Sequence, residues 1–255
     1  QPDENGTSFS NLNPLEVRDR EFNYLSSSLG LRKIIDNFEI NTWIMNTMKA
    51  PKIEELYSDG PHLGTYSYEI GEPNLELEKI YGVESSIRYN VSPIDISLST
   101  FYNYSPYYYQ MTKIGECEEE FIAGESHPCA GADFIEWGSG SSGWLYKYQT
   151  TGVRSLIKGF EFNLSYDYQN FKIVYDFALV RGDNLTEKTP LSYINPTKQI
   201  LNFEYKKELM NYKIRLSKIH SQDRLGEFES YTPSSFLVDF ILGYNRKNQN
   251  ITIQF

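Results

Sequence analysis

The residues best suited to bind a metal gather in one polar segment, ECEEEFIAGESHPCAGAD, which spans residues 116–133. Histidine and carboxylate side chains together can bind zinc, and a further histidine lies in an earlier polar segment. The candidate metal ligands are His62, Glu118, Glu120, Glu125 and His127. Their spacing matches no standard zinc motif, so an acidic loop stiffened by a disulfide is the favoured alternative.

The two cysteines of the chain, Cys117 and Cys129, both lie in this segment. We expect a disulfide between them in an oxidising compartment, where closing so short a loop has a small entropic cost. The alternative is two separate thiols in a reducing compartment. Spacing alone does not distinguish the two.

The remaining sequence patterns do not support an enzyme. The histidines His62, His127 and His220 lie in three separate segments, and there is no nucleophile motif or glycine-rich phosphate loop. We therefore expect no catalytic residues. The net charge of −10 argues against a nucleic acid partner.

Aromatic residues are abundant, with 21 Tyr and 15 Phe in the chain. One Tyr-rich run favours an aromatic girdle at a membrane interface, with a stacking surface for a ligand as the alternative. That run consists of Tyr102, Tyr104, Tyr107, Tyr108 and Tyr109. The residues that we expect to contact a ligand lie in the polar segments: His62, Tyr66, Tyr68, Trp137, Trp144 and Tyr146.

Alternation of apolar and polar residues with a period of two, as in GFEFNLSYDY, runs through nearly the whole chain and predicts β-strands. Helical patterns are almost absent, although PKIEEL could form one turn. Short turns are predicted near residues 34–37, 90–93, 168–170, 207–210 and 246–249. Long polar connections are predicted at residues 50–74, 106–143, 183–196 and 221–232.

Short and long connections alternate strictly, which gives five hairpins and about ten strands. This alternation is typical of an antiparallel transmembrane β-barrel with short turns on one rim. The alternative is a soluble β-sandwich, whose connections would not sort by length. The last strand, NITIQF, is too short to span a bilayer. We therefore predict that the chain does not close a barrel alone, and that both end strands pair with β-structure outside this sequence.

The segment MKAPKIEELYSDGPHLGTYSYEIGEPNLELEK, residues 48–79, resembles the mid-barrel signature of TonB-dependent outer-membrane receptors. The matching residues are Ala50, Pro51, Glu54, Glu55, Leu56, Tyr57, Gly71, Pro73, Leu75 and Glu78. The sequence departs from the signature at Lys49 for Arg, Glu72 for Asn or Asp, and Leu77 for Pro. The resemblance extends over about residues 18–255, and GPHLGTYSYEIGEPNL is closest to a branch that includes metal-uptake receptors.

The resemblance implies an all-β fold: an antiparallel transmembrane barrel sector of about ten strands, part of a 22-stranded barrel whose plug domain is not in this chain. Residues 1–255 would form part of that barrel, with residues 1–19 in an extracellular loop. It implies a receptor in the bacterial outer membrane that takes up a scarce nutrient, a metal ion or a siderophore-like chelate, by TonB-dependent gating. The alternative is a passive porin or a surface-binding barrel protein.

The same resemblance implies the partners of the chain. They are outer-membrane lipid, the remaining barrel strands, the plug domain, and the inner-membrane TonB energy complex acting through that plug. No tightly bound cofactor is expected; a metal ion or chelate would be cargo.

Overall fold

The computed structural model describes residues 18–62, 64, 67–114, 134–136, 144–227, 229–246 and 249–254. Only the backbone is described for residues 134–136, 144–146, 246, 249, 250 and 254. The chain divides into two compact units, each considered by itself below. Unit 1 comprises Gln1–Leu25, Thr47–Ile80 and Ser105–Arg154, and unit 2 comprises Ser26–Asn46, Tyr81–Tyr104 and Ser155–Phe255.

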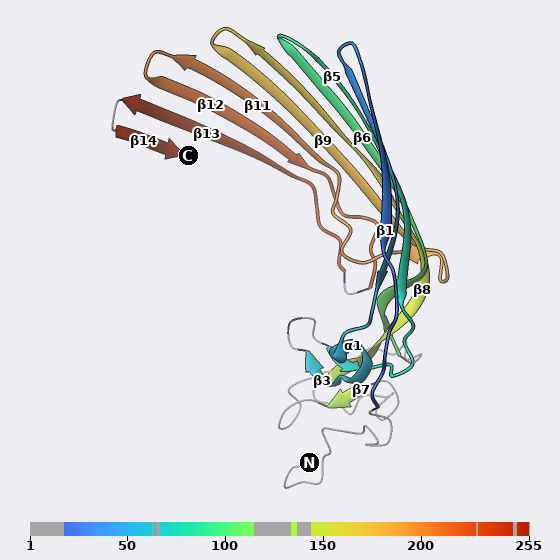
Figure 1. The fold of residues 1–255 in the computed structure, drawn as a ribbon. Helices are drawn as coiled ribbons and strands as arrows, with labels where there is room; N and C mark the ends of the chain where they lie inside the picture. The colour runs from blue at the N-terminus through green and yellow to red at the C-terminus, as the bar shows by residue number, and fades with distance from the viewer. Residues whose placement is uncertain are drawn as a thin grey trace. The chain divides into compact units, whose positions relative to one another are not determined.

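Nearly all of the secondary structure is β-strand (Figure 1). The long strands are β1 (Ser27–Ile35), β2 (Phe38–Lys49), β5 (Glu78–Val91), β6 (Ile94–Lys113), β8 (Trp144–Tyr168), β9 (Phe171–Asn184), β11 (Lys198–Lys207), β12 (Met210–Ile219), β13 (Ser235–Arg246) and β14 (Gln249–Gln254). The short elements are α1 (Ile53–Tyr57), β3 (Asp59–His62), β4 (Ser67–Ile70), β7 (Phe134–Glu136) and β10 (Thr189–Pro190). No helix in the described ranges is long and apolar enough to cross a membrane.

The long strands form one sheet in the order β1-β2-β5-β6-β8-β9-β11-β12-β13-β14 among the described residues. The pairs β1–β2, β8–β9, β11–β12 and β13–β14 are antiparallel hairpins at the predicted positions, and β5 and β6 are neighbours around the predicted turn at 92–93. The prediction of five hairpins and about ten strands is therefore confirmed.

Three of these hairpins turn through only two residues, and the first of the two has a positive φ. The angles are 51° at Asp36, 55° at Gln169 and 50° at Glu208. A positive φ at this position matches the right-handed twist of the flanking strands. Asp tolerates this backbone region better than Gln and Glu, which carry a small strain.

Unit 2 contains β1, β9, β10, β11 to β14, and the turn-side parts of β2, β5, β6 and β8. The sheet order begins at β1 and ends at β14, and within the described residues these two strands pair only with β2 and β13. The prediction that the end strands do not pair with each other is confirmed there. The chain therefore does not close a barrel on its own in this structure.

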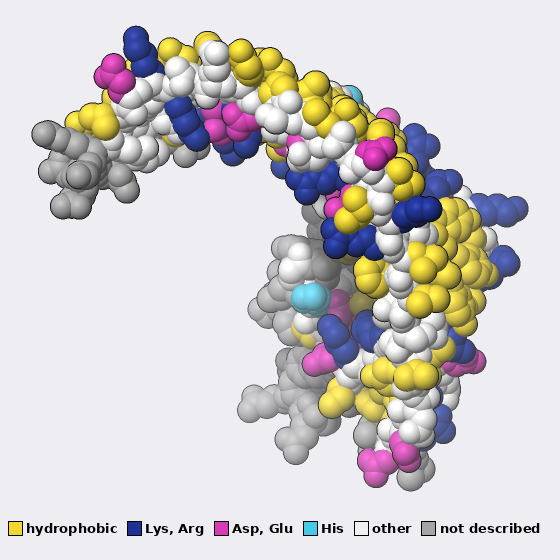
Figure 2. Space-filling view, turned by 45° about the horizontal axis from the view of Figure 1, so that its top comes forward, with side chains coloured by type: hydrophobic (Ala, Val, Ile, Leu, Met, Phe, Trp, Pro, Cys, Tyr) yellow, Lys and Arg dark blue, Asp and Glu magenta, His cyan; other side chains and the backbone are white. Residues whose placement is uncertain are grey.

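The two faces of the unit 2 sheet differ in polarity, as the β8–β9 hairpin illustrates. One face carries the cross-strand pairs Phe160–Leu179 and Phe162–Phe177, and the opposite face carries Asn163–Asp176 and Asp167–Lys172. Figure 2 shows hydrophobic side chains gathered along one face of the sheet.

The described residues leave the apolar face uncovered. Exposed large hydrophobic side chains occur on β1, β2, β5, β6, β8, β9, β11, β12, β13 and β14. The buried hydrophobic residues described are Leu56, Tyr68, Leu75, Tyr148, Val153 and Leu191, and all except Leu191 belong to unit 1. A soluble β-sandwich would bury one face of each sheet. An apolar face this extensive is instead typical of the outer wall of a transmembrane barrel.

Unit 1 contains α1, β3, β4, β7 and the other ends of β2, β5, β6 and β8. The predicted connection at residues 50–74 is thus partly regular, because it includes α1 and the β3–β4 hairpin. β4 adds in parallel to β8, with Ser67 opposite Tyr146. β6 runs through Lys113, so the first eight residues of the connection predicted at 106–143 are strand.

Candidate functional site

The short helix α1 is held at its start by Glu55. The Glu55 carboxylate accepts a hydrogen bond from the backbone N–H of Lys52 at 2.7 Å, which satisfies a donor that no helical carbonyl reaches. Pro51 directly precedes this position and lacks an N–H of its own. The backbone N–H of Glu72 donates to the Glu55 carbonyl at 3.0 Å and so ties the later part of the segment to the helix.

Lys49 lies between two carboxylates. Its Nζ is 3.4 Å from Glu55 Oε1 and 3.6 Å from Glu78 Oε2. The Lys49 side chain is 43% exposed, whereas those of Glu55 and Glu78 are mostly buried. Lysine therefore supplies the positive charge that arginine usually supplies at this position of the signature.

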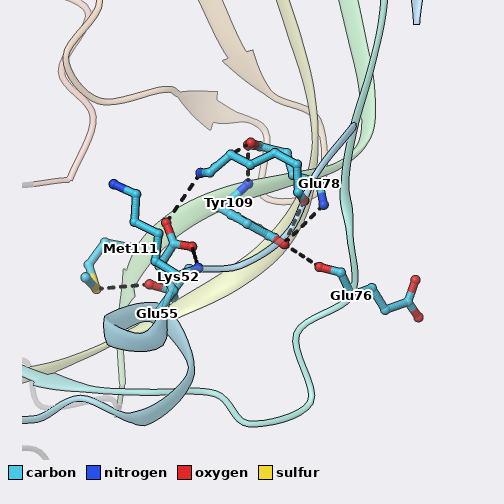
Figure 3. Close-up of polar contacts among 8 residues, drawn as sticks. Lys52, Glu55, Glu76, Glu78, Tyr109 and Met111 are labelled. Carbon is cyan, nitrogen blue, oxygen red and sulfur yellow. Dashed lines mark hydrogen bonds and ion pairs between the residues drawn. The ribbon is translucent and has the colours of Figure 1, made fainter. Parts of the chain in front are cut away.

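Tyr109 of β6 completes the group that we call the Tyr109 cluster: Lys49, Glu55, Glu76, Glu78 and Tyr109. Figure 3 labels the last four of these residues. The Tyr109 hydroxyl accepts from the Glu78 N–H at 3.1 Å and donates to the Glu76 carbonyl oxygen. The Tyr109 N–H donates to Glu78 Oε1 at 3.1 Å, and Lys49 Nζ lies 4.9 Å from the ring centroid. Burial, with the nearby Glu55 and Glu78 carboxylates, raises the pKa of Tyr109 to about 12.

Three further signature residues pack the same segment. A Cβ on Gly71 would lie 2.3 Å from the backbone carbon of Leu56, so only glycine fits there. Leu75 is fully buried, and its carbonyl accepts from Arg20 Nη1 at 2.8 Å. Pro73 contributes a second acceptor to Arg20 at 2.6 Å.

The Tyr109 cluster therefore positions the segment between β2 and β5. The Glu55 and Glu78 carboxylates and the Tyr109 hydroxyl bond to backbone groups or to Lys49, and Glu76 contributes its backbone groups. The sequence analysis recognised the signature but did not identify what its residues bond to, because Glu78 and Tyr109 are 31 residues apart.

The prediction of a girdle is wrong for Tyr107 and Tyr109. The Tyr107 hydroxyl accepts from the Glu76 N–H at 3.2 Å, and Tyr109 belongs to the cluster just described. Tyr102 and Tyr104 belong to unit 2, whereas Tyr107 and Tyr109 belong to unit 1. Tyr102 is 52% exposed on the apolar face, where a girdle residue is expected.

Two predicted ligand residues lie on the β3–β4 hairpin. The His62 Nδ1 atom is in hydrogen-bond contact with Glu69 Oε1, and the His62 side chain is exposed. Tyr68 is 2% exposed, and its hydroxyl donates to Asp59 Oδ1 at 2.7 Å. Burial is the main cause that raises the Tyr68 pKa, and Asp59 adds to it. Tyr68 therefore packs inside unit 1 in this structure.

Two further residues that were predicted to contact a ligand lie on the strand next to this hairpin. Trp144 and Tyr146 begin β8, whose residues 146–149 pair with β4. The side chains of both residues lie outside the described part. The remaining predicted residues also lie outside the described residues: Tyr66, Trp137, Glu118, Glu120, Glu125, His127, Cys117 and Cys129.

No group of three or more His, Cys, Asp or Glu side chains that could hold a metal ion occurs among the described residues. His62 and Glu69 form a pair, which is one ligand short of even an open zinc site. The proposed ligand set of His62 with the 118–127 segment stays a prediction.

The polar face of unit 2 carries ion pairs that the sequence analysis did not predict. Arg32 Nε lies 2.9 Å from Glu39 Oε1, and Lys213 Nζ lies 2.8 Å from Glu204 Oε1. Asn163 Nδ2 donates to Asp176 Oδ1 at 2.6 Å. A pocket of about 300 Å³ is lined by residues of β6, β8, β9 and β11, including Ser97, Ser99, Asn163, Asp176 and Lys198. The arrangement fits the water-filled interior of a barrel.

Two long connections of unit 2, after β9 and after β12, are bonded to each other. Arg224 Nη2 forms an ion pair with Asp183 Oδ1. The Glu229 carboxylate accepts from the N–H of Tyr193 at 2.8 Å and from the N–H of Gly226 at 2.7 Å. These contacts give this pair of connections a defined conformation.

Comparison with known proteins agrees with this geometry. A family model described as "TonB dependent receptor-like, beta-barrel" matches residues 3–255, so the family resemblance is confirmed. No curated protein matches the chain.

Three solved structures share the fold. The "Copper transporter OprC" is 15% identical to this chain and has a TM-score of 0.66. The match covers 86% of this chain and 31% of the OprC chain. The siderophore receptor PirA from Acinetobacter baumannii is 16% identical with a TM-score of 0.59, covering 86% of this chain and 34% of its own. The ferric enterobactin receptor PfeA from Pseudomonas aeruginosa is 16% identical and has a TM-score of 0.61. The match covers 86% of this chain and 32% of the PfeA chain. The chain thus spans about a third of the length of each structure.

Proposed function

Because the chain belongs to the TonB-dependent receptor family, whose barrel model matches residues 3–255, we propose that it is part of an outer-membrane receptor for active nutrient uptake. The observation that carries this proposal is the family match together with the two-faced sheet. An uncovered apolar face and a polar opposite face fit a wall between lipid and water. We propose a transporter rather than an enzyme.

In this proposal the five short turns face the periplasm and the long connections face outward. The Tyr109 cluster then fixes the outer connection between β2 and β5, and the bonded connections after β9 and β12 lie on the same rim. The residues predicted to contact ligand, His62 among them, would lie there as well.

The free edges of β1 and β14 would pair with further strands of a 22-stranded barrel. Their outward N–H and C=O groups have no partner among the described residues. In hydrocarbon each unsatisfied backbone group costs several kcal/mol, so further strands are required on both sides.

The proposed cargo is a scarce metal ion or a metal chelate. Support comes from the solved relatives, whose names describe transport of copper and reception of siderophores and ferric enterobactin. The plug domain and the TonB energy complex would be the partners that drive uptake. A passive porin is the competing function.

The test is uptake by cells that express the full-length receptor as their only source of this activity. Radiolabelled copper, free iron and a panel of ferric siderophores would be offered at nanomolar concentration. We expect accumulation of one of them in cells with an active TonB complex and none in matched cells that lack TonB. Equal uptake with and without TonB would favour the porin, and no uptake of any metal would contradict the proposed cargo.

A further inference from the structure

Lys158 and Arg181 lie side by side on the apolar face of unit 2. They are cross-strand partners in the β8–β9 hairpin, two positions beyond the pair Phe160–Leu179. Because side chains alternate along a strand, both pairs belong to the same face. Lys158 and Arg181 are both exposed. Figure 2 shows Lys and Arg side chains projecting at the border of the hydrophobic band.

These two cations are the first charges met on this face of β8 and β9 from the turn at residues 169–170. Up to that point the face carries only apolar and aromatic side chains: Phe160, Phe162, Leu164, Tyr166, Tyr168, Phe171, Ile173, Tyr175, Phe177 and Leu179. Lys158 lies ten residues before Tyr168. Ten residues at about 3.3 Å each, tilted by about 40°, rise about 25 Å, which is the height of the apolar band of a barrel.

The positive charges are not neutralised by the described protein. Neither Lys158 nor Arg181 forms an ion pair or a side-chain hydrogen bond in the described part of the chain. The acidic side chain two positions beyond Arg181, Asp183, is paired with Arg224. Two adjacent cations at the edge of a lipid-facing surface are therefore left without an anion among the described residues.

We propose that Lys158 and Arg181 form a binding site for the phosphate of a lipid headgroup in the leaflet next to the long connections. A guanidinium binds phosphate through two parallel hydrogen bonds, and an ammonium adds a point charge. The acyl chains of the same lipid would lie along Phe160 and Leu179. The site rests on the proposed membrane setting but not on the identity of the cargo.

The test uses the purified full-length receptor in neutral detergent, titrated with bis-phosphorylated lipid A and followed by native mass spectrometry. The double variant Lys158→Gln/Arg181→Gln should bind about thirty-fold more weakly, since each cation near a lipid surface contributes about 1 kcal/mol. Lys33→Gln is the matched control, because Lys33 lies on the same face near the opposite rim. Its affinity should stay within about threefold of the parent.

Several outcomes would overturn the proposal. They are unchanged affinity in the double variant, an equal loss in Lys33→Gln, equal binding of fully dephosphorylated lipid A, or displacement of the lipid by inorganic phosphate alone. If the double variant does not fold, Arg181→Lys and salt dependence decide. Binding should survive in Arg181→Lys and weaken steeply from about 50 to 500 mM salt, and salt-independent binding would refute it. If the parent receptor takes up nutrient normally but does not bind lipid A, the lipid site is refuted and the proposed transport function is not.

Discussion

Replacing Glu78 with alanine should release the segment between β2 and β5 from β6. Glu78 is only 8% exposed, and its carboxylate accepts the Tyr109 N–H at 3.1 Å. The same carboxylate lies 3.6 Å from Lys49 Nζ. Alanine removes both contacts and leaves a largely enclosed N–H without an acceptor.

The expected cost follows from these two contacts. A hydrogen bond to a charged group contributes about 1.5–3 kcal/mol, and a buried donor left unsatisfied costs a similar amount. The ion pair adds about 0–1 kcal/mol, because Lys49 is 43% exposed and water screens it. The opening free energy of the segment should therefore fall by about 2–4 kcal/mol, which is a factor of about 30 to 1000 in the opening equilibrium.

The assay is amide hydrogen exchange with mass spectrometry on the full-length receptor. Peptides that cover residues 50–78 and 105–113 should lose protection by that factor, whereas those from the β11–β12 hairpin should not change. Glu76→Ala is the matched control, because Glu76 contributes only backbone groups to the cluster and its exposed carboxylate points away (Figure 3). Glu78→Gln keeps an acceptor and should fall between the two.

A loss of protection below about threefold in Glu78→Ala, or an equal loss in Glu76→Ala, would refute this reasoning. Either result would mean that apolar packing alone holds the segment in place. The anchoring role assigned to the Tyr109 cluster would then be wrong.

Three further predictions concern single features. Gly71→Ala should destabilise the same segment by about 1–3 kcal/mol, because its Cβ would collide with the Leu56 backbone. Amide hydrogen exchange of residues 50–78 measures this loss of stability, and unchanged protection would contradict the clash. Tyr109, with a pKa raised from 10.0 to about 12, should stabilise the fold fully below pH 10 and lose that contribution as the pH rises toward 12. The difference between the ultraviolet titration curves of the parent and of Tyr109→Phe should show one tyrosine that ionises near pH 12. A difference transition near pH 10 would contradict this prediction. Cys117 and Cys129 should resist alkylation until reduced, as peptide mass spectrometry can check, and rapid labelling without reductant would disprove the disulfide.

Much of the fold followed from local patterns. The turn predicted near residues 168–170 follows directly after the alternating strand GFEFNLSYDY, and this two-residue turn sets the register in which Phe160 faces Leu179. Hydrophobic alternation likewise indicated which face is apolar. β3 and β4 were missed, because four-residue strands within an acidic, aromatic segment carry no clear period.

The candidate site was less predictable. The run from Tyr102 to Tyr109 was treated as one group, although odd and even positions of a strand face opposite sides. Tyr68 was predicted to contact ligand from its residue type, but its register opposite Pro61 and its bond to Asp59 bury it. Residue type indicates what a side chain can bind, and burial decides whether it is accessible.

The sequence by itself determined the strand pattern, the family and the polarity of the two faces, because each depends on neighbours within a few residues. Only the tertiary structure decided the contacts that join distant segments. Glu78 meets Tyr109 across 31 residues, and Asp183 meets Arg224 across 41. Such pairs form only when sheet order and register bring the two strands or connections together, and neither partner carries a local signal of the other.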